Sequence, residues 1–380
     1  MTSASTDALA LAQALIRRPS VTPQDAGALD VLEAVLKQLD FTTHRLPFGD
    51  VDNLYARRGE EAPHFCFAGH TDVVPVGEGW KADPFAAEVR DGMLYGRGAA
   101  DMKSAIAAFV AAAERLPRPS GSISLLITGD EEGAAVNGTV KLLDWLKARG
   151  ETIDHCVVGE PTSVARAGDT LKIGRRGSIN FKVAVRGVQG HVGYPQKAKN
   201  PIPVLAELVT QFSSHKLDNG NEHFDASTLA FTTVDVGNDA TNVIPGQARA
   251  AFNIRFNDKH TPESLINWVK DRAASIAQQS GCEIDVSAQT SGSCFLTAPG
   301  KFTQLVSDTV AGITGRAPVF STSGGTSDAR FIKDFCPVVE LGLAGTTMHK
   351  ADECVALSEI AALTDIYAAL LSAYFAKPPI

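Results

Sequence analysis

The stretch His-Phe-Cys-Phe-Ala-Gly-His-Thr-Asp, residues 64–72, decides the fold. Its apolar run from Phe65 to Ala68, closed by a glycine, predicts a buried strand. His70 and Asp72 stand two residues apart, so in extended backbone they project to the same side. A histidine and a carboxylate at the C-terminal end of such a strand are typical of the sites that α/β proteins build. An isolated His-x-Asp pair is more often structural, so the rest of the chain has to decide.

Strands and helices alternate around this stretch, which predicts an α/β domain with a mostly parallel sheet. The expected strands lie at 52–58, 64–70, 123–128, 156–158 and 337–343, and the expected helices at 7–18, 23–39, 102–116, 142–150, 301–313 and 358–376. Thr22 is the expected N-cap of the second helix and Pro23 its first residue. Asp91-Gly92 predicts a hairpin turn between short strands.

The pattern changes between about residues 178 and 290. It becomes strand 180–185, helix 201–213, strands 228–236 and 247–256, helix 262–280 and strand 283–288. This β-α-β-β-α-β order is that of ferredoxin-like domains. Because 380 residues are too many for one comfortable core, we predict two domains. Residues 1–177 and 291–380 form the α/β catalytic domain, and 178–290 form a domain inserted into it.

Composition excludes several classes of function. The net charge of −8 argues against nucleic acid or an anionic membrane as the main partner. No apolar run approaches the roughly 20 residues that span a bilayer. Residues 1–7 lack the pattern of a secretory signal, so a cytoplasmic protein is expected. The six cysteines contain no Cys-x-x-Cys pair, which predicts free thiols and excludes a thiolate zinc cluster.

Further carboxylates and a second histidine each fall just after a predicted strand, where a parallel sheet presents its C-terminal edge, and one of them also stands at the mouth of a helix. They are Asp101, Glu131, Glu132, Glu160 and His349. So many charged groups cannot lie together at one sheet edge without a counter-charge, because their repulsion in a partly buried site is too large. One divalent cation relieves the conflict and two relieve it better. Histidine and carboxylate ligands suit zinc, with manganese or cobalt possible, and a shared aspartate would bridge two ions at about 3.5–4 Å.

The chain resembles the M20 metallopeptidases, the aminoacylase and carboxypeptidase G2 group of di-zinc amidohydrolases, over essentially its full length. The segments that carry the resemblance are 69–75, Trp80 with Pro84-Phe85, 96–98, 101–103, 130–133, 158–161 and His349. The resemblance implies that His70, Asp101 and Glu160 hold one metal. It also implies that Asp101, Glu132 and His349 hold the other. Asp72 would then orient His70 through its other ring nitrogen, and Glu131 would be the general base.

The arginines limit the class of substrate. Arginine recognises a carboxylate with two parallel hydrogen bonds, so several arginines suggest a substrate with several carboxylates. Some of these arginines, Arg176 among them, are equally well explained as surface charges, and His191 could be structural. Similarity to the family's lysine and cell-wall pathway member implies that the substrate contacts are Arg175, Tyr194, Arg255, Gly325 and Thr326. It also implies that His191, with Asn242, reaches a partner subunit's site and stabilises the oxyanion. The inserted domain would carry the homodimer interface and close as a lid.

Two positions depart from the pattern of that family member. Gly345 stands where an asparagine is expected, which puts one substrate contact in question, and Cys294 replaces an expected proline. A sibling amidohydrolase, such as an acetylornithine deacetylase or an aminoacylase, and a metal-binding scaffold without activity remain alternatives. Glu131 argues against the scaffold, since binding alone needs no base. Arg175, Arg255 and the Gly-Gly-Thr-Ser-Asp run at 324–328 favour a dicarboxylic acyl group.

Overall fold

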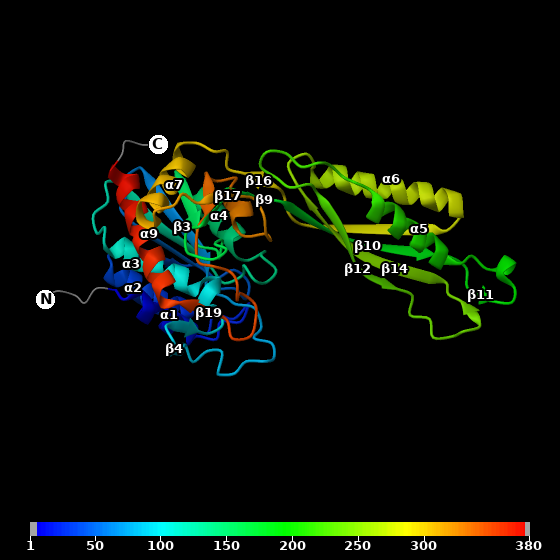
Figure 1. Ribbon diagram of the computed structural model, residues 1–380, viewed down its shortest axis with the longest axis horizontal. Coiled ribbons are helices and arrows are strands. Elements are labelled where there is room, and N and C mark those ends of the chain that lie inside the picture. Colours follow the sequence, from blue (N-terminus) through cyan, green and yellow to red (C-terminus); the bar gives the residue numbers. More distant parts are fainter. Residues whose placement is uncertain (1–5, 377–380) are drawn as a thin grey trace. The chain divides into compact units, whose positions relative to one another are not determined.

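The computed structural model describes residues 6–376, and these form two compact units (Figure 1). The first unit comprises the chain up to Ile173, Thr297–Ser321 and the chain from Ser327. The second unit comprises Gly174–Leu296 and Thr322–Thr326. Each unit has its own sheet and its own buried apolar residues.

A mixed eight-stranded sheet, in the order β1-β2-β6-β3-β7-β18-β8-β17, forms the centre of the first unit. The central strands β6, β3, β7 and β18 are parallel to one another, whereas β1, β2 and β8 add antiparallel pairs. The expected parallel core is therefore present within a mixed sheet. The strands are β1 (Thr42–Arg45), β2 (Leu54–Arg58), β3 (His64–His70), β6 (Ser122–Thr128), β7 (His155–Val158), β8 (Thr170–Lys172), β17 (Val319–Ser321) and β18 (Val338–Glu340).

Helices pack around this sheet. Helix α9 contacts α1, α3 and α7, α1 also contacts α3, and α4 contacts both β6 and α8. The helices of the first unit are α1 (Ala8–Ile16), α2 (Ala28–Gln38), α3 (Ser104–Glu114), α4 (Thr139–Ala148), α7 (Lys301–Thr314), α8 (Ala329–Ile332) and α9 (Leu357–Ala376).

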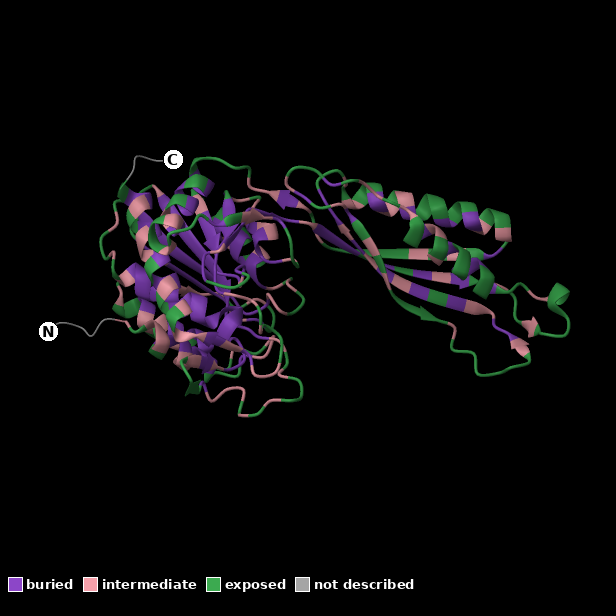
Figure 2. Ribbon diagram, in the orientation of Figure 1, coloured by how far each residue is buried: buried purple, intermediate pink, exposed green. Residues whose placement is uncertain are grey.

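Strand β3 lies in the middle of the sheet and is buried at every residue, as Figure 2 shows for the central strands. Phe67 stacks on Phe109 of α3 with ring centres 4.3 Å apart. Tyr367 of α9 meets both rings edge-on. The strand predicted from residues 64–70 is thus confirmed, and its odd-numbered aromatic residues tie it to two helices.

A small antiparallel sheet joins two distant segments of the first unit. It consists of β4 (Val89–Arg90), β5 (Met93–Tyr95) and β19 (Cys354–Ala356). Asp91 and Gly92 both have left-handed backbone, with φ of 49° and 75°, as a two-residue hairpin turn requires. The predicted hairpin is confirmed. After β5 the chain enters a short irregular helical turn, η1 (Ala99–Lys103), which leads into α3.

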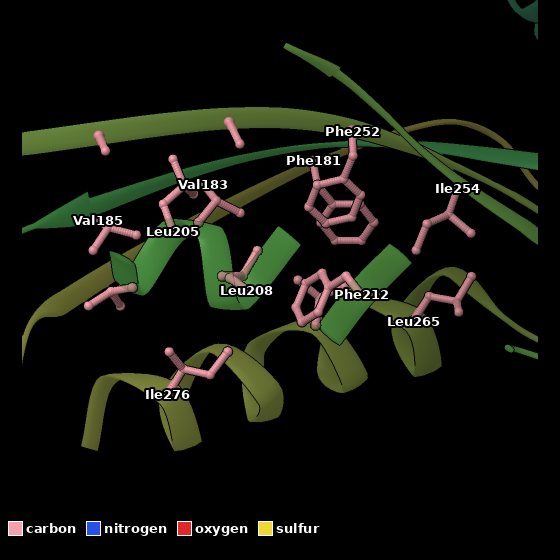
Figure 3. Packing of buried hydrophobic residues seen from close by; sticks show 14 of the residues in the cluster. Phe181, Val183, Val185, Leu205, Leu208, Phe212, Phe252, Ile254, Leu265 and Ile276 are labelled. Atoms are coloured by element: carbon pink, nitrogen blue, oxygen red, sulfur yellow. The ribbon is translucent and has the colours of Figure 1, made fainter. Parts of the chain in front are cut away.

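The second unit contains a four-stranded antiparallel sheet in the order β12-β14-β10-β15. Helices α5 and α6 lie on one face of it and enclose an apolar core that includes Phe181, Phe212 and Phe252 (Figure 3). The long elements are β10 (Gly177–Arg186), α5 (Pro201–Ser214), β12 (Thr228–Asp235), β14 (Gln247–Phe256), α6 (Pro262–Ser280) and β15 (Glu283–Gly292). The short ones are β9 (Gly174–Arg175), β11 (Gly190–His191), η2 (Pro195–Lys197), β13 (Val243–Ile244) and β16 (Phe295–Leu296).

The units divide a few residues away from the sequence boundaries at 177/178 and 290/291. Strand β9 pairs with β16, which groups both strands with the second unit. The segment 322–326 joins them, because Arg175 donates to the Gly325 carbonyl at 2.7 Å.

Helix α2 begins at Ala28, so the expected start at Pro23 with Thr22 as N-cap is wrong. The Thr22 N–H donates instead to the Val73 carbonyl, which ties this segment to the loop after β3. Asp25 accepts the N–H groups of Gly27 and Leu29 at 3.0 and 2.9 Å, and so supplies the cap from inside the turn.

Among the described residues, α9 is long and apolar enough by composition to cross a membrane. The expectation that no segment approaches that length therefore needs correction. Half of the most apolar stretch of α9 is buried inside the structure, where Tyr367 and Leu371 are 1% and 0% exposed. This burial is that of a core helix, and it explains the apolar composition without a membrane.

Candidate active site

His70 ends β3, and the strand's hydrogen bonds fix its position at the edge of the sheet. Its Nδ1 donates to the backbone carbonyl of Asp72 at 2.9 Å, because a carbonyl can only accept. The other ring nitrogen, Nε2, is 3.1 Å from Asp101 Oδ1 and 3.7 Å from Glu160 Oε1. The imidazole therefore presents one atom to a group of carboxylates.

Asp101 lies in η1, at the mouth of α3 as expected from the sequence. It uses its two oxygens in opposite directions. Oδ1 faces His70, whereas Oδ2 is 3.3 Å from Nε2 of His349. His349 Nε2 is also 2.9 Å from Glu132 Oε1. One carboxylate thus stands between two imidazoles that come from opposite ends of the chain.

Glu131 and Glu132 follow β6, and Glu160 follows β7, so these three residues do lie just beyond strand ends. Asp101 and His349 do not share that origin. Asp101 comes from the irregular turn after β5, and His349 lies nine residues beyond the end of β18. The sheet edge therefore supplies only part of the site, and loops supply the rest.

The Asp72 carboxylate has closer partners than the His70 ring. Its two oxygens accept the backbone N–H groups of Glu131 and Glu132, at 3.3 and 3.0 Å. They lie farther from the His70 ring, with Oδ1 3.6 Å from Nδ1. Asp72 does orient His70, but through its own carbonyl, while its side chain holds the peptide that carries the two glutamates.

Six side chains converge closely enough to hold metal ions. Ligand atoms lie within 4.8 Å of one another in each of three sets, which are His70–Asp101–Glu160, Asp101–Glu132–His349 and His70–Glu131–Glu132. The first two sets share Asp101 and match the two ligand sets that the family resemblance implies. The structure thus brings all five expected ligands and Glu131 together, and their binding of metal stays a prediction.

Negative charges outnumber positive charges among the side chains of this cluster. Burial, followed by the charge of Glu160, raises the pKa of Glu131 well above its usual value. Burial alone would lower the pKa of His70, but the hydrogen bond and charge of Asp101 raise it well above normal. Hydrogen bonds to Asp101 and Glu132 raise the pKa of His349 to about 10. Without a cation, protons have to neutralise this group of carboxylates.

The arrangement of the ligand atoms fits a divalent metal ion. Because His70 Nδ1 donates to a carbonyl, a neutral His70 carries a lone pair on Nε2. A lone pair 3.1 Å from a carboxylate oxygen is repulsive unless a positive charge lies between the two atoms. Imidazole nitrogens and carboxylate oxygens, without thiolate, suit zinc, cobalt or manganese.

The substrate residues expected from the sequence fall into two groups within the second unit. Arg175 bonds the Gly325 carbonyl, beside Thr326. Burial lowers the pKa of Arg255, and the nearby charges of Arg176 and Arg175 lower it further. Three guanidinium groups are therefore neighbours, and Arg176 belongs with them rather than among isolated surface charges.

His191, Tyr194 and Asn242 form the other group, at the β11–β13 pair. The rings of His191 and Tyr194 lie 5.7 Å apart, and the Val192 N–H donates to the Asn242 carbonyl at 3.1 Å. This pair and β9 adjoin opposite ends of β10 (Figure 1). The ten residues of β10 span about 30 Å. The second unit of one chain therefore does not bring Tyr194 to the arginines.

Neither of the two departures belongs to the sets of possible metal ligands. A Cβ at Gly345 would be 3.0 Å from the Pro161 carbonyl and 3.2 Å from Met348 Sδ, so an asparagine here needs a local shift. Cys294 is partly buried and packs against the core of the second unit. Glu353, which no motif in the sequence marks, is fully buried and accepts the Asp101 N–H. Only its place four residues after His349 could have drawn attention to it.

Comparisons with known proteins agree on one family. The sequence model described as Peptidase family M20/M25/M40 matches residues 66–373. A protein of Parvibaculum lavamentivorans named succinyl-diaminopimelate desuccinylase is 57% identical over 97% of this chain and 96% of its own. One of the same name from a Caulobacter species is 57% identical over 98% of this chain and 97% of its own.

Solved structures show the same fold. The aminopeptidase PepT of Bacillus cereus superposes with a TM-score of 0.81 at 21% identity, covering 97% of this chain and 98% of its own. The YXEP protein of Bacillus subtilis, described as a dinuclear metal binding peptidase from the M20 family, superposes with a TM-score of 0.75 at 18% identity. That match covers 98% of each chain.

Proposed function

Because the chain belongs to peptidase family M20/M25/M40, we propose that it is a di-metal hydrolase of N-succinyl-LL-2,6-diaminopimelate. It cleaves the amide to succinate and LL-2,6-diaminopimelate, a step in lysine and cell-wall precursor biosynthesis in the cytoplasm. The observation that carries the chemistry is Asp101, shared between two ligand sets with Glu131 beside them. The substrate follows from relatives that are 57% identical over nearly the whole chain.

The proposed ligands form two sets around the shared carboxylate. His70, Asp101 and Glu160 hold one ion, and Asp101, Glu132 and His349 hold the other. Zinc is the proposed metal, and cobalt or manganese can substitute. Bound there, the two ions supply positive charge that polarises the amide carbonyl and lowers the pKa of a water molecule.

Glu131 moves the proton. Its carboxylate takes a proton from the attacking water and delivers it to the nitrogen of the leaving amine, so the amide bond breaks as the amine becomes neutral. The place of Glu131 within the ligand group, beside Glu132, supports this role. The Asp72 side chain holds the Glu131 peptide in place.

The second unit supplies substrate contacts. Arg175 and Arg255, with the backbone at Gly325 and Thr326, bind the carboxylates of the substrate. In the proposal the second unit, with its β-α-β-β-α-β order, is a ferredoxin-like dimerisation domain and lid. The separation of the His191 group from the arginines supports a homodimer in which His191, Tyr194 and Asn242 serve the partner's site.

Hydrolysis of N-succinyl-LL-2,6-diaminopimelate and of N-acetylornithine by zinc-loaded protein tests the proposal, with EDTA-treated protein as control. We expect strong preference for the succinyl substrate and loss of activity on chelation. Preference for acetylornithine would retain the chemistry and overturn the substrate. Glu131→Gln should bind zinc and lose turnover by at least about 100-fold. Zinc binding by the unaltered protein without hydrolysis of either substrate would instead indicate a scaffold.

A further inference from the structure

A buried ion pair adjoins the group of possible metal ligands in the first unit, because Glu353 bonds the peptide of Asp101. Arg97 Nη1 donates to Glu353 Oε2 at 2.7 Å, and the two side chains are 2% and 1% exposed. The ring of Trp80 covers the guanidinium carbon at 5.2 Å. A fully buried pair of this kind persists only where its remaining donors and acceptors are satisfied, so those partners indicate what the pair does.

The second oxygen of Glu353 holds the bridging aspartate. Oε1 accepts the backbone N–H groups of Ala100 and Asp101, at 2.9 and 3.1 Å. These bonds fix the backbone of Asp101, the residue that both ligand sets share. They are bonds to a charged acceptor in a dry environment, which makes them stronger than ordinary backbone bonds.

The remaining donors of Arg97 reach two other segments. Nη1 also donates to the Lys350 carbonyl, one residue after His349, at 3.2 Å. Nη2 donates to the Val76 carbonyl at 3.1 Å, in the chain that follows His70 and Asp72. One guanidinium therefore ties together the segments that present both histidines.

His349 itself needs such support. Its backbone φ is +62°, in the left-handed region that few residues other than glycine adopt. A residue persists there when the surrounding structure determines its conformation. The Lys350 carbonyl bound to Arg97 and the Thr347 hydroxyl bound to the Cys354 carbonyl, at 2.8 Å, enclose the turn that contains it.

We infer that Arg97 and Glu353 are positioning residues that set the separation of the two metals. They do so by joining the peptide of Asp101 to the segments that carry His349 and His70. The inference rests on the proposed di-metal function. Both residues act through backbone groups, and neither belongs to the sets of possible metal ligands.

Glu353→Gln tests this inference. The glutamine oxygen can still accept from one backbone N–H, but its amide nitrogen meets a donor of Arg97 and the charge is lost. We expect zinc affinity for at least one of the two sites to fall about 10- to 100-fold, measured by competition with a chelator. The absorption spectrum of the Co²⁺-loaded variant should change, and kcat should fall while KM stays near its original value.

Glu151→Gln is the matched control. Glu151 pairs with Arg57 and accepts from Tyr55, in the same unit but without contact to a ligand segment. It should lose stability and keep its metal affinity and its Co²⁺ spectrum. Arg97→Lys is a second test. It retains the charge but loses the branched guanidinium group that donates to several carbonyls, so it should weaken zinc binding as Glu353→Gln does.

The outcomes separate the two proposals. If the unaltered protein fails to bind two zinc ions, the proposed function fails. If the unaltered protein binds two and both variants keep its zinc affinities and Co²⁺ spectrum, the positioning role is overturned. A purely structural role predicts lower melting temperatures with unchanged metal binding, as for Glu151→Gln. If one variant does not fold, the other carries the test.

Discussion

Replacing Asp72 by asparagine tests which part of this residue serves catalysis. The side chain accepts the N–H groups of Glu131 and Glu132, at 3.3 and 3.0 Å. The backbone carbonyl, which the substitution leaves unchanged, holds His70 Nδ1 at 2.9 Å. The variant should therefore disturb the two glutamates and leave the orientation of His70 intact.

The size of the effect follows from the bonds that are lost. Asparagine offers one acceptor oxygen, and its amide nitrogen is a donor, so one of the two backbone N–H groups loses its partner. A hydrogen bond to a charged group contributes about 1.5–3 kcal/mol, and about 2 kcal/mol corresponds to about 30-fold in rate. We expect kcat to fall by this factor. KM should change little, because no substrate contact is removed.

Initial rates at pH 8 with saturating zinc provide the assay, together with zinc dissociation constants. Burial raises the pKa of Asp72 to about 6, so the reference side chain is ionised at that pH. Asp169→Asn is the control, because Asp169 also accepts backbone N–H groups, those of Val164, Ala165 and Arg166, but holds no ligand segment. A fall in zinc affinity with kcat unchanged at saturating zinc would refute the reasoning and restore a side-chain role in orienting His70.

Further measurements test other parts of the structure. After metal removal, Glu131→Gln should melt at a higher temperature than the unaltered apoprotein, because it removes a buried carboxyl whose pKa burial and Glu160 raise; a lower melting temperature would contradict this. Burial lowers the pKa of His64 to about 4, so its contribution to stability is fully present above about pH 6.5 and is lost as the pH falls toward 4. The loss amounts to about 3 kcal/mol, and His64→Gln should flatten this part of the denaturation curve against pH. Arg255→Gln should raise KM for the succinyl substrate about 10- to 100-fold, whereas an unchanged KM would remove Arg255 from the substrate site.

The sequence predicted the elements whose cause is local. The apolar run at 64–70 becomes β3 with the expected bounds, and the helix from Pro262 to Ser280 has the predicted start and end. The apolar run sets the strand and the capping residues set the helix, and both signals lie within a few residues of the element. The candidate metal ligands could also be predicted, because a histidine or carboxylate that follows a buried strand can be recognised within a single segment of sequence.

Contacts between distant segments were not predictable in this way. Glu353 accepts from Asp101 across 252 positions of sequence, and no local pattern marks that pairing. The backbone carbonyl that holds His70 is chemically identical in every residue, so the sequence suggested the Asp72 carboxylate instead. The Thr22 N–H bonds to the Val73 carbonyl in another loop, and no local pattern marks that contact either.

The buried carboxylates of the first unit divide by what satisfies them. Asp130 accepts the N–H groups of Val136 and Asn137, and Glu353 accepts those of Ala100 and Asp101 together with a guanidinium. The protein itself satisfies the oxygens of these acids, which stabilise loops whether or not a metal is bound. Burial raises the pKa of both Glu353 and Glu131, but hydrogen bonds from Arg97 and from backbone N–H groups oppose the rise at Glu353, whereas the charge of Glu160 adds to it at Glu131. A carboxyl that the fold buries beside other acids opposes folding in the absence of metal, so its position is explained by chemistry rather than by stability.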